Sequence, residues 1–319
     1  MAWDFETDPE YQAKLDWADK FVREEVEPLD LAWPHQQFVP LDGDHWIING
    51  YKYFSSNAKT ASFLIVMVVT NTEVSAYKGM SMFLVPTDTP GVIIERNVGL
   101  HGEPMDQGTH ALIHYENVRV PDSALLGGEG QAFAVAQTRL GGGRIHHAMR
   151  TIGLAQKAID MMCERVLSRE TAGSRLADKQ FIQGYIADSY AQLAQFRLFV
   201  LNTAWKIDKY NDYKKVRKDI ATAKVIMPTV LHDIAWRAMQ VHGALGVTNE
   251  MPFLTMVHGA AVMGLADGPT EVHKMTVAKQ VLRDYKPSDD LWPTEWIPRK
   301  TAAAKAKYAE YLELEVGNL

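Results

Sequence analysis

The chain has 319 residues, of which 47% are hydrophobic and 23% are charged, a balance typical of a folded protein and unlike that of a disordered one. A chain of this length can bury a large core without disulfides or metal ions, and at about 150 residues per domain it predicts about two domains. Its 33 lysines and arginines against 39 aspartates and glutamates give a net charge of −6. This charge excludes a sequence-wide basic field, so we expect neither nucleic acid nor an anionic membrane as a ligand.

The cysteine content and the apolar runs indicate the compartment. Cys163 is the only cysteine in the sequence, so the chain has no intramolecular disulfide and suits the reducing cytoplasm. Residues 1–20 are acidic and lack the apolar stretch of a secretory signal. The longest apolar runs, such as 61–69, have the length of a strand and not the roughly 20 residues of a membrane span. We therefore expect a cytoplasmic protein without a membrane span.

The first part of the chain predicts one helix followed by a β-rich region. Apolar residues at steps of three and four predict a helix over 9–28, which Pro28 ends. In the β-rich region, Asn49-Gly50 is a strong hairpin signal because a type I′ turn needs positive φ at both central positions. We expect an antiparallel sheet or barrel with strands at 46–50, 51–56, 62–70, 80–86, 91–97 and 109–121.

From residue 131 to the end the apolar period is helical. The step of three and four residues is clear at Ile152, Ala155, Ile159 and Met162. We expect helices near 131–169, 179–211, 214–243, 251–265, 268–284 and 298–314. A helix, then a sheet, then a helical bundle is an α+β order, and it differs from the βαβ alternation of a dinucleotide-binding domain.

Several familiar catalytic and binding motifs do not fit. The glycine clusters at 127–130 and 141–143 could cradle a phosphate, but neither has the P-loop pattern or a βαβ context, so we interpret them as loop residues. His146 and His147 are adjacent and point to different faces of a helix, and His273 has no partner motif, so we predict no metal site. The GxSxG motif of a serine hydrolase is absent from the sequence.

The segment GLADGPTEVHK (264–274) is more informative. Asp267 lies in a break between two predicted helices, where a carboxylate can reach into a cleft, and Glu271 follows four residues later. The alternative interpretation is an acidic helix N-terminus that the helix dipole favours. Arg144 and Arg169, each taken alone, are better explained as surface arginines.

Taken together, these segments resemble the acyl-CoA dehydrogenase family, in the branch whose base loop follows the pattern ADGP-x-EVH. The similarity is carried by INGYKYFSSNA (48–58), ENVRVP (116–121), GGEGQAF (127–133), AMQVHGALGV (238–247) and ADGPTEVH (266–273). The resemblance implies a short N-terminal helix, an antiparallel β domain and a C-terminal helical bundle. It places a remnant of the N-terminal helical domain at 1–40, the β domain at 41–125 and the bundle with a C-terminal extension at 126–319.

The same resemblance implies an FAD-dependent enzyme that desaturates an acyl-CoA thioester and passes its electrons to an electron-transfer flavoprotein. Family members assemble as homodimers or homotetramers. The rest of the family's N-terminal helical domain has no counterpart in this sequence, and its loss would uncover apolar surface on the sheet and the bundle.

Site residues carry over from the family motifs position by position. Asp267 stands where the family places its catalytic glutamate. The resemblance assigns the substrate side to Gly141, Gly142, Gly143, Arg144 and Gly268. It assigns FAD contacts to Phe54, Ser55, Ser56, Arg169, Gln240, Val241, His242, Gly243, Ala244, Pro269, Thr270 and Glu271. Of these, Arg169 and the 240–244 loop would reach the FAD of a partner subunit.

Two other functions stay open at this point. The chain could be a non-catalytic remnant that oligomerises or binds a partner through its helical bundle. It could also be a flavin oxidase or monooxygenase, because such enzymes share the family's architecture.

Overall fold

The computed structural model describes residues 13, 20, 40–100, 103–104 and 107–316, and the side chains up to residue 313. The helix predicted over 9–28 lies almost wholly outside these residues. Ala13 and Lys20 are the two of its positions that are described, and both are helical.

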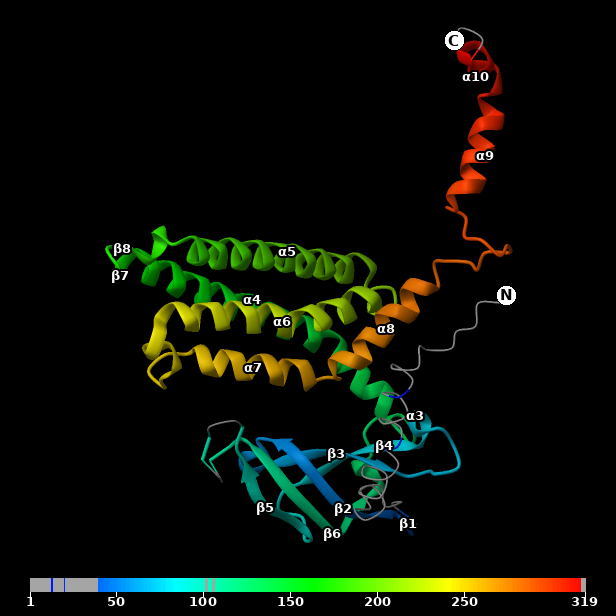
Figure 1. The fold of residues 1–319 in the computed structure, drawn as a ribbon. Helices are drawn as coiled ribbons and strands as arrows, with labels where there is room; N and C mark the ends of the chain where they lie inside the picture. The colour runs from blue at the N-terminus through cyan, green and yellow to red at the C-terminus, as the bar shows by residue number, and fades with distance from the viewer. Residues whose placement is uncertain (1–12, 14–19, 21–39, 101–102, 105–106, 317–319) are drawn as a thin grey trace.

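The β region contains a four-stranded antiparallel sheet and a two-stranded one (Figure 1). The larger sheet has the order β1-β2-β6-β5, formed by Leu41–Asp42, His45–Ser56, His110–Pro121 and Val92–Val98. The smaller sheet pairs β3 (Phe63–Val69) with β4 (Met80–Pro86). The predicted antiparallel strands are therefore confirmed from 62 onward, with boundaries shifted by at most one residue.

The hairpin predicted at Asn49-Gly50 is wrong. Strand β2 runs unbroken through both residues, and the register of β2 against β6 shifts there because of a β-bulge. The Asn49 side chain accepts a hydrogen bond from the backbone N–H of Asn117 at 2.7 Å, so its polar group stabilises the strand pair. The tight turn instead lies at Gly43 and Asp44 between β1 and β2, where Gly43 has φ 66°.

One apolar core holds the two sheets together. Side chains from both sheets belong to this core, among them Val66 and Phe83 from the smaller sheet and Ile113 from the larger one. In β6, Ala111, Ile113 and Tyr115 are buried while their neighbours are less so, as the alternation in the sequence predicts. Short helical turns connect the strands: η2 (Ala58–Thr60), α3 (Ala76–Gly79) and η3 (Asp122–Ala124).

A glycine-rich segment leads from the sheets into the bundle. The backbone N–H of Gly130 donates to the hydroxyl of Ser81 at 2.9 Å, and a Cβ at Gly130 would lie 2.4 Å from the carbonyl oxygen of Lys78. Gly130 has φ 72°, so it meets both a steric and a conformational need for glycine. The cluster at 127–130 therefore connects two parts of the fold.

The C-terminal part is a bundle of long helices (Figure 1). These are α4 (Ala132–Ser168), α5 (Gln180–Tyr210), α6 (Arg217–His242), α7 (Phe253–Leu265) and α8 (Thr270–Leu282). A small hairpin follows α4, and single turns precede α5 and α7; these elements are β7 (Glu170–Thr171), β8 (Ser174–Arg175), η4 (Leu176–Asp178) and η5 (Gly243–Val247). The five predicted helices between 131 and 284 are confirmed, each with ends displaced by no more than about three residues.

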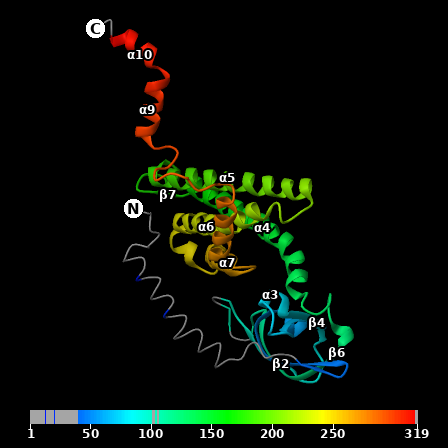
Figure 2. The same ribbon diagram turned by 90° about the vertical axis from the view of Figure 1, so that its right-hand side faces the viewer.

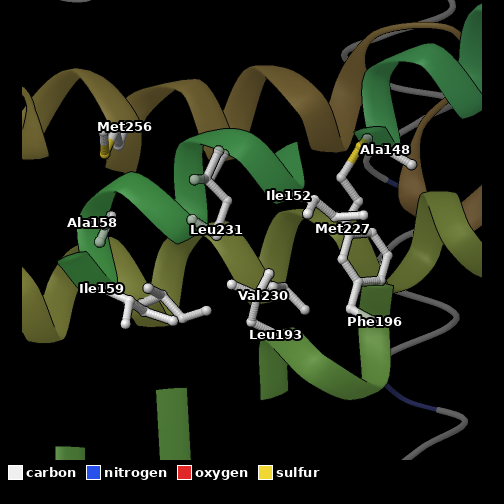
Figure 3. Close-up of a cluster of buried hydrophobic side chains, with 14 of the residues drawn as sticks. Ala148, Ile152, Ala158, Ile159, Leu193, Phe196, Met227, Val230, Leu231 and Met256 are labelled. Atoms are coloured by element: carbon white, nitrogen blue, oxygen red, sulfur yellow. The ribbon is translucent and has the colours of Figure 1, made fainter. Parts of the chain in front are cut away.

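The bundle core is built on the predicted apolar period of α4. Ile152, Ala155, Ile159 and Met162 are at most 6% exposed, and they pack in one cluster with side chains of α5, α6 and α7. Figure 3 shows Ile152 and Ile159 of α4 facing Leu231 and Val230 of α6. Helix α6 contacts α4, α5, α7 and α8 and is therefore the central helix of the bundle.

The β region lies on one side of the bundle, and α4 runs from one into the other (Figures 1 and 2). At the other end of the chain, the single helix predicted at 298–314 is two helices, α9 (Ile297–Lys307) and α10 (Ala309–Val316). Both project away from the bundle (Figure 2). Within the described part of the chain, no helix combines the length and the apolar character that crossing a membrane requires.

Candidate active site

The loop between α7 and α8 presents Asp267 outside both helices, as the sequence predicts. Asp267 has φ 57° and Gly268 has φ 103°, so two consecutive residues adopt the left-handed region and turn the chain sharply. Aspartate tolerates this conformation better than most residues with a side chain. A Cβ at Gly268 would lie 3.0 Å from Nε2 of His273, which makes glycine the fitting residue there.

Three cationic or polar side chains hold this loop by its backbone. Arg144 of α4 donates from Nε to the carbonyl oxygen of Asp267 at 3.1 Å, and His273 Nε2 lies 3.2 Å from the same oxygen. Lys224 of α6 donates from Nζ to the carbonyl oxygens of Met263 and Ala266, both at 2.6 Å. Lys224 is only 1% exposed, so its ammonium group neutralises the carbonyl end of α7 from inside the bundle.

The carboxylate of Asp267 lies in a sheltered position against α4. Its side chain is 16% exposed, and Oδ2 lies 3.3 Å from Nε2 of His147. A Cβ at Gly143 would lie 3.7 Å from the same oxygen. The geometry toward His147 is not that of a hydrogen bond, and Oδ2 has no hydrogen-bond partner among the described residues. A buried carboxylate oxygen without a partner is free to accept a proton from a bound molecule.

Burial governs the ionisation of the groups around this carboxylate. Burial lowers the pKa of His147 and of His273, so both imidazoles are neutral near pH 7. Burial also lowers the pKa of Arg144 and Lys224, and the negative charge of Asp267 partly opposes that shift. The arginine stays charged, because its guanidinium does not deprotonate in proteins.

Gly141, Gly142 and Gly143, predicted on the substrate side, lie within α4 and do not interrupt it. A Cβ at Gly141 would lie 3.2 Å from the ring of Tyr213, so this glycine accommodates the tyrosine. Gly142 lies near the hydroxyl of the same tyrosine, and Gly143 faces Asp267. Of the predicted substrate-side residues, the structure thus gathers Gly143, Arg144 and Gly268 at Asp267.

Phe54, Ser55 and Ser56 lie in the β region, at the end of β2. The register of β2 against β6 shifts between Lys52 and Ser55, and Phe54 in this bulge has φ 74°. Its ring is 44% exposed and lies 4.1 Å from the ring of His110. An exposed aromatic ring followed in sequence by two serines offers stacking and hydrogen-bonding groups, which are the kinds of group that a flavin ring could use.

The remaining predicted cofactor residues lie elsewhere. Pro269 caps α8, Thr270 donates to the carbonyl oxygen of Gly264 at 3.1 Å, and Glu271 is exposed in the first turn. Arg169 and the segment 240–244 lie at the opposite end of the bundle, beside β7 and η5 (Figure 1). At 1.5 Å per residue, α4 alone separates Arg169 from Arg144 by about 37 Å.

The segment 240–244 is helical and not the predicted loop, because residues 240–242 end α6 and residues 243–244 begin η5. Two of its side chains are buried. Val241 is 6% and His242 is 7% exposed, and the His242 ring packs on Phe253 with its Nδ1 2.7 Å from the carbonyl oxygen of Ala238. Gln240 and Ala244 are exposed. A ligand at this segment would therefore meet Gln240, Ala244 and backbone groups first.

Three residues at Asp267 were not predicted as site residues, and for two of them the sequence holds only a weak signal. His147 follows Arg144 by three positions and so shares its helix face. Lys224 interrupts the apolar stripe of α6, a pattern that indicates a buried lysine. His273 falls one turn after the start of α8 and could not be paired with the loop without its turn geometry.

Comparisons with known proteins match this architecture. The family description "Acyl-CoA dehydrogenase, middle domain" matches residues 24–118, and "Acyl-CoA dehydrogenase, C-terminal domain" matches residues 130–282. The family's N-terminal domain is absent from these matches. Among solved structures, butyryl-CoA dehydrogenase from Megasphaera elsdenii is 26% identical with a TM-score of 0.68, covering 78% of this chain and 64% of that one. A solved protein from Mycobacterium abscessus is 36% identical with a TM-score of 0.74, and the match covers 78% of this chain and 61% of that one.

Curated relatives carry the same family name. "Probable acyl-CoA dehydrogenase FadE2" from Mycobacterium tuberculosis is 42% identical over 250 residues, which are 78% of this chain and 61% of that protein. "Acyl-CoA dehydrogenase family member 11" from Rattus norvegicus is 42% identical over 251 residues, 77% of this chain and 32% of that protein. The chain belongs to the acyl-CoA dehydrogenase family. It spans about three fifths of the first relative and about a third of the second.

Proposed function

We propose that this protein is an FAD-dependent acyl-CoA dehydrogenase that removes one hydrogen from the α-carbon and one from the β-carbon of an acyl-CoA thioester. The observation that carries the proposal is the Asp267 carboxylate, which is sheltered and lacks a hydrogen-bond partner on Oδ2 among the described residues. The backbone carbonyl of Asp267 is contacted by Arg144 of α4 and His273 of α8. The family's activity in its relatives, such as butyryl-CoA dehydrogenase, supports the substrate class.

In this proposal Asp267 removes the α-proton as a general base. The α-proton of a thioester is weakly acidic, so the base must be placed within hydrogen-bond reach of it and kept from water. The two successive left-handed residues and the contacts of Arg144 to the Asp267 carbonyl fix the position of the loop. Because Asp267 is held by its backbone, its carboxylate remains available for the substrate.

The flavin ring would lie against Phe54, with Ser55 and Ser56 at its polar edge. FAD supplies an acceptor for the β-hydride when it is bound. The exposure of Phe54 and the bulge of β2 at this residue support this placement. Pro269, Thr270 and Glu271 follow the base directly and complete the predicted FAD contacts of the same subunit.

A second copy of the chain would contribute to each FAD site. Arg169, Gln240 and Ala244 are exposed at the end of the bundle remote from Asp267, where they suit the phosphates and adenosine of the partner subunit's FAD. We therefore propose a homodimer or homotetramer, with an electron-transfer flavoprotein as the electron acceptor. The relatives are longer than this chain, so their full activity is carried over as part of the proposal.

The test is anaerobic mixing of the FAD-loaded protein with acyl-CoA thioesters of several chain lengths. A dehydrogenase loses its oxidised-flavin absorbance and recovers it when electron-transfer flavoprotein is added. Recovery with oxygen instead would indicate an oxidase, a function that shares this fold in the prolyl acyl carrier protein oxidase AnaB (19% identical, TM-score 0.70). A protein that binds no FAD, or whose flavin is unchanged by every thioester, would contradict the proposal and favour a binding role.

A further inference from the structure

One side chain at the base has no part in the function proposed above. His147 lies one helical turn after Arg144 on α4, and its Nε2 is 3.3 Å from Oδ2 of Asp267. The two side chains are 23% and 16% exposed, so the pair is largely sheltered from water. The adjacent His146 is exposed on another face of the helix and offers a natural comparison.

The contacts around Asp267 divide between its backbone and its carboxylate. Arg144 and His273 reach the carbonyl oxygen of Asp267, and Lys224 reaches carbonyl oxygens earlier in the loop. Among these groups, His147 is the one whose nitrogen faces the carboxylate itself. It is therefore placed to control the orientation of the reacting oxygen atoms, which the backbone contacts do not fix.

The unsatisfied carboxylate oxygen points to the same conclusion. Asp267 Oδ2 and His147 Nδ1 are both buried and without a hydrogen-bond partner among the described residues. Leaving the carboxylate oxygen unpaired costs about 1–3 kcal/mol, so a small rotation that pairs Nε2–H of His147 with Oδ2 is favoured. In the tautomer with its proton on Nε2, the neutral imidazole is a donor to the carboxylate.

We propose that His147 is a positioning residue for the base, whose imidazole holds the carboxylate of Asp267 in the orientation that meets the α-proton. This role rests on the function proposed above. Without a donor at this place the carboxylate turns about its side-chain bonds, and the fraction of molecules with an oxygen in line with the substrate falls.

The charge state of His147 depends on groups from every packed element. These are Arg150 and His146 on α4, Lys224 on α6 and Asp267 on the loop. Arg144 of α4 and His273 of α8 contact the carbonyl oxygen of the same aspartate. Burial is the largest influence and lowers the pKa of His147, Arg150, Lys224 and His146 lower it further, and Asp267 raises it. The imidazole therefore donates as a neutral group near pH 7.

The pairing is tested without substrate by NMR. Histidine rings labelled with ¹³C at Cε1 are titrated in the wild type and in Asp267→Asn, and the His147 signal is identified by its loss in His147→Gln. Because Asp267 raises the pKa of His147, its titration midpoint falls in Asp267→Asn. An unchanged midpoint for His147 overturns the proposal, whether or not the protein proves to be a dehydrogenase.

The positioning role is tested by turnover of the FAD-loaded protein. His147→Leu removes the donor, and we expect kcat to fall about tenfold or more with KM within about twofold. His147→Gln keeps an amide donor at nearly the same reach and restores most of the rate, and His146→Leu is the matched control with an unchanged rate. Equal rates for His147→Leu and His147→Gln overturn the proposal. If the leucine variant fails to fold by circular dichroism, the glutamine variant decides: a kcat within about threefold of wild type supports the proposal, and a larger loss overturns it.

Discussion

The buried lysine of α6 gives the sharpest prediction about stability. Lys224 is 1% exposed and donates to the carbonyl oxygens of Met263 and Ala266, both at 2.6 Å, at the end of α7. Replacing it with methionine keeps an unbranched side chain of similar length but removes both hydrogen bonds. A hydrogen bond to a charged group contributes about 1.5–3 kcal/mol, so the two together contribute about 3–6 kcal/mol. Methionine recovers part of this by removing a buried charge, so we expect a net loss of about 2–4 kcal/mol.

The assay is equilibrium unfolding in urea at pH 7, followed by circular dichroism. Lys218→Met is the matched control, because Lys218 lies on the same helix and pairs with Asp284 at 3.3 Å while 43% exposed. An exposed ion pair contributes at most about 1 kcal/mol, so this variant should lose no more than that. Equal losses for the two lysines, or a loss below about 0.5 kcal/mol for Lys224→Met, would refute the account of Lys224 as the residue that holds the base loop.

Three further predictions follow from single positions. Burial lowers the pKa of His273, so the unfolded chain binds more protons below about pH 6.5, and the free energy of unfolding should fall as the pH drops from 7 to 5.5; urea titrations should show a shallower fall in His273→Gln. Gly130→Ala should destabilise by about 2–4 kcal/mol in the same assay, because it combines a positive φ with a contact of 2.4 Å to a carbonyl oxygen, whereas Gly153→Ala in α4, with no atom within 4 Å, should stabilise by about 0.5–1 kcal/mol. Phe54→Ala should weaken FAD binding about two- to tenfold in a fluorescence titration, and no change would contradict the flavin placement.

The secondary structure was largely predictable because its signals are local. The apolar period of α4 and the alternation in β6 each predict which face of the element is buried. The structure confirms both predictions. The prediction of a hairpin at Asn49-Gly50 was wrong because this dipeptide is compatible with a β-bulge as well as with a turn. The contact between Asn49 and Asn117, 68 residues apart in sequence, decides between them.

Site residues that belong to a sequence motif could be predicted. Site residues that only helix packing brings together could not. Asp267 stood out because it lies in a Gly-Pro break between two helices. The partners of its loop come from three helices, and only their packing brings His147, Lys224 and His273 together. Isolated histidines and a lysine within an apolar stripe belong to no recognisable motif. The histidines were therefore considered only as metal ligands and rejected, and the lysine was not considered.

The outer face of the smaller sheet carries exposed apolar side chains. Phe63 and Ile65 of β3 are 55% and 58% exposed, and Leu84 of β4 is 39% exposed, so the outer face of the smaller sheet is apolar. Surfaces of this kind are usually covered by another element or another molecule.

The identity of the base is tested most directly by single-turnover flavin reduction in Asp267→Asn. The amide has nearly the shape of the carboxylate but cannot accept the α-proton, so the rate of flavin reduction by an acyl-CoA thioester should fall about 10²- to 10⁴-fold with FAD still bound. Asp284→Asn, an exposed carboxylate that pairs with Lys218, should reduce its flavin at the wild-type rate. A rate in Asp267→Asn within about threefold of wild type would contradict the assignment of Asp267 as the base.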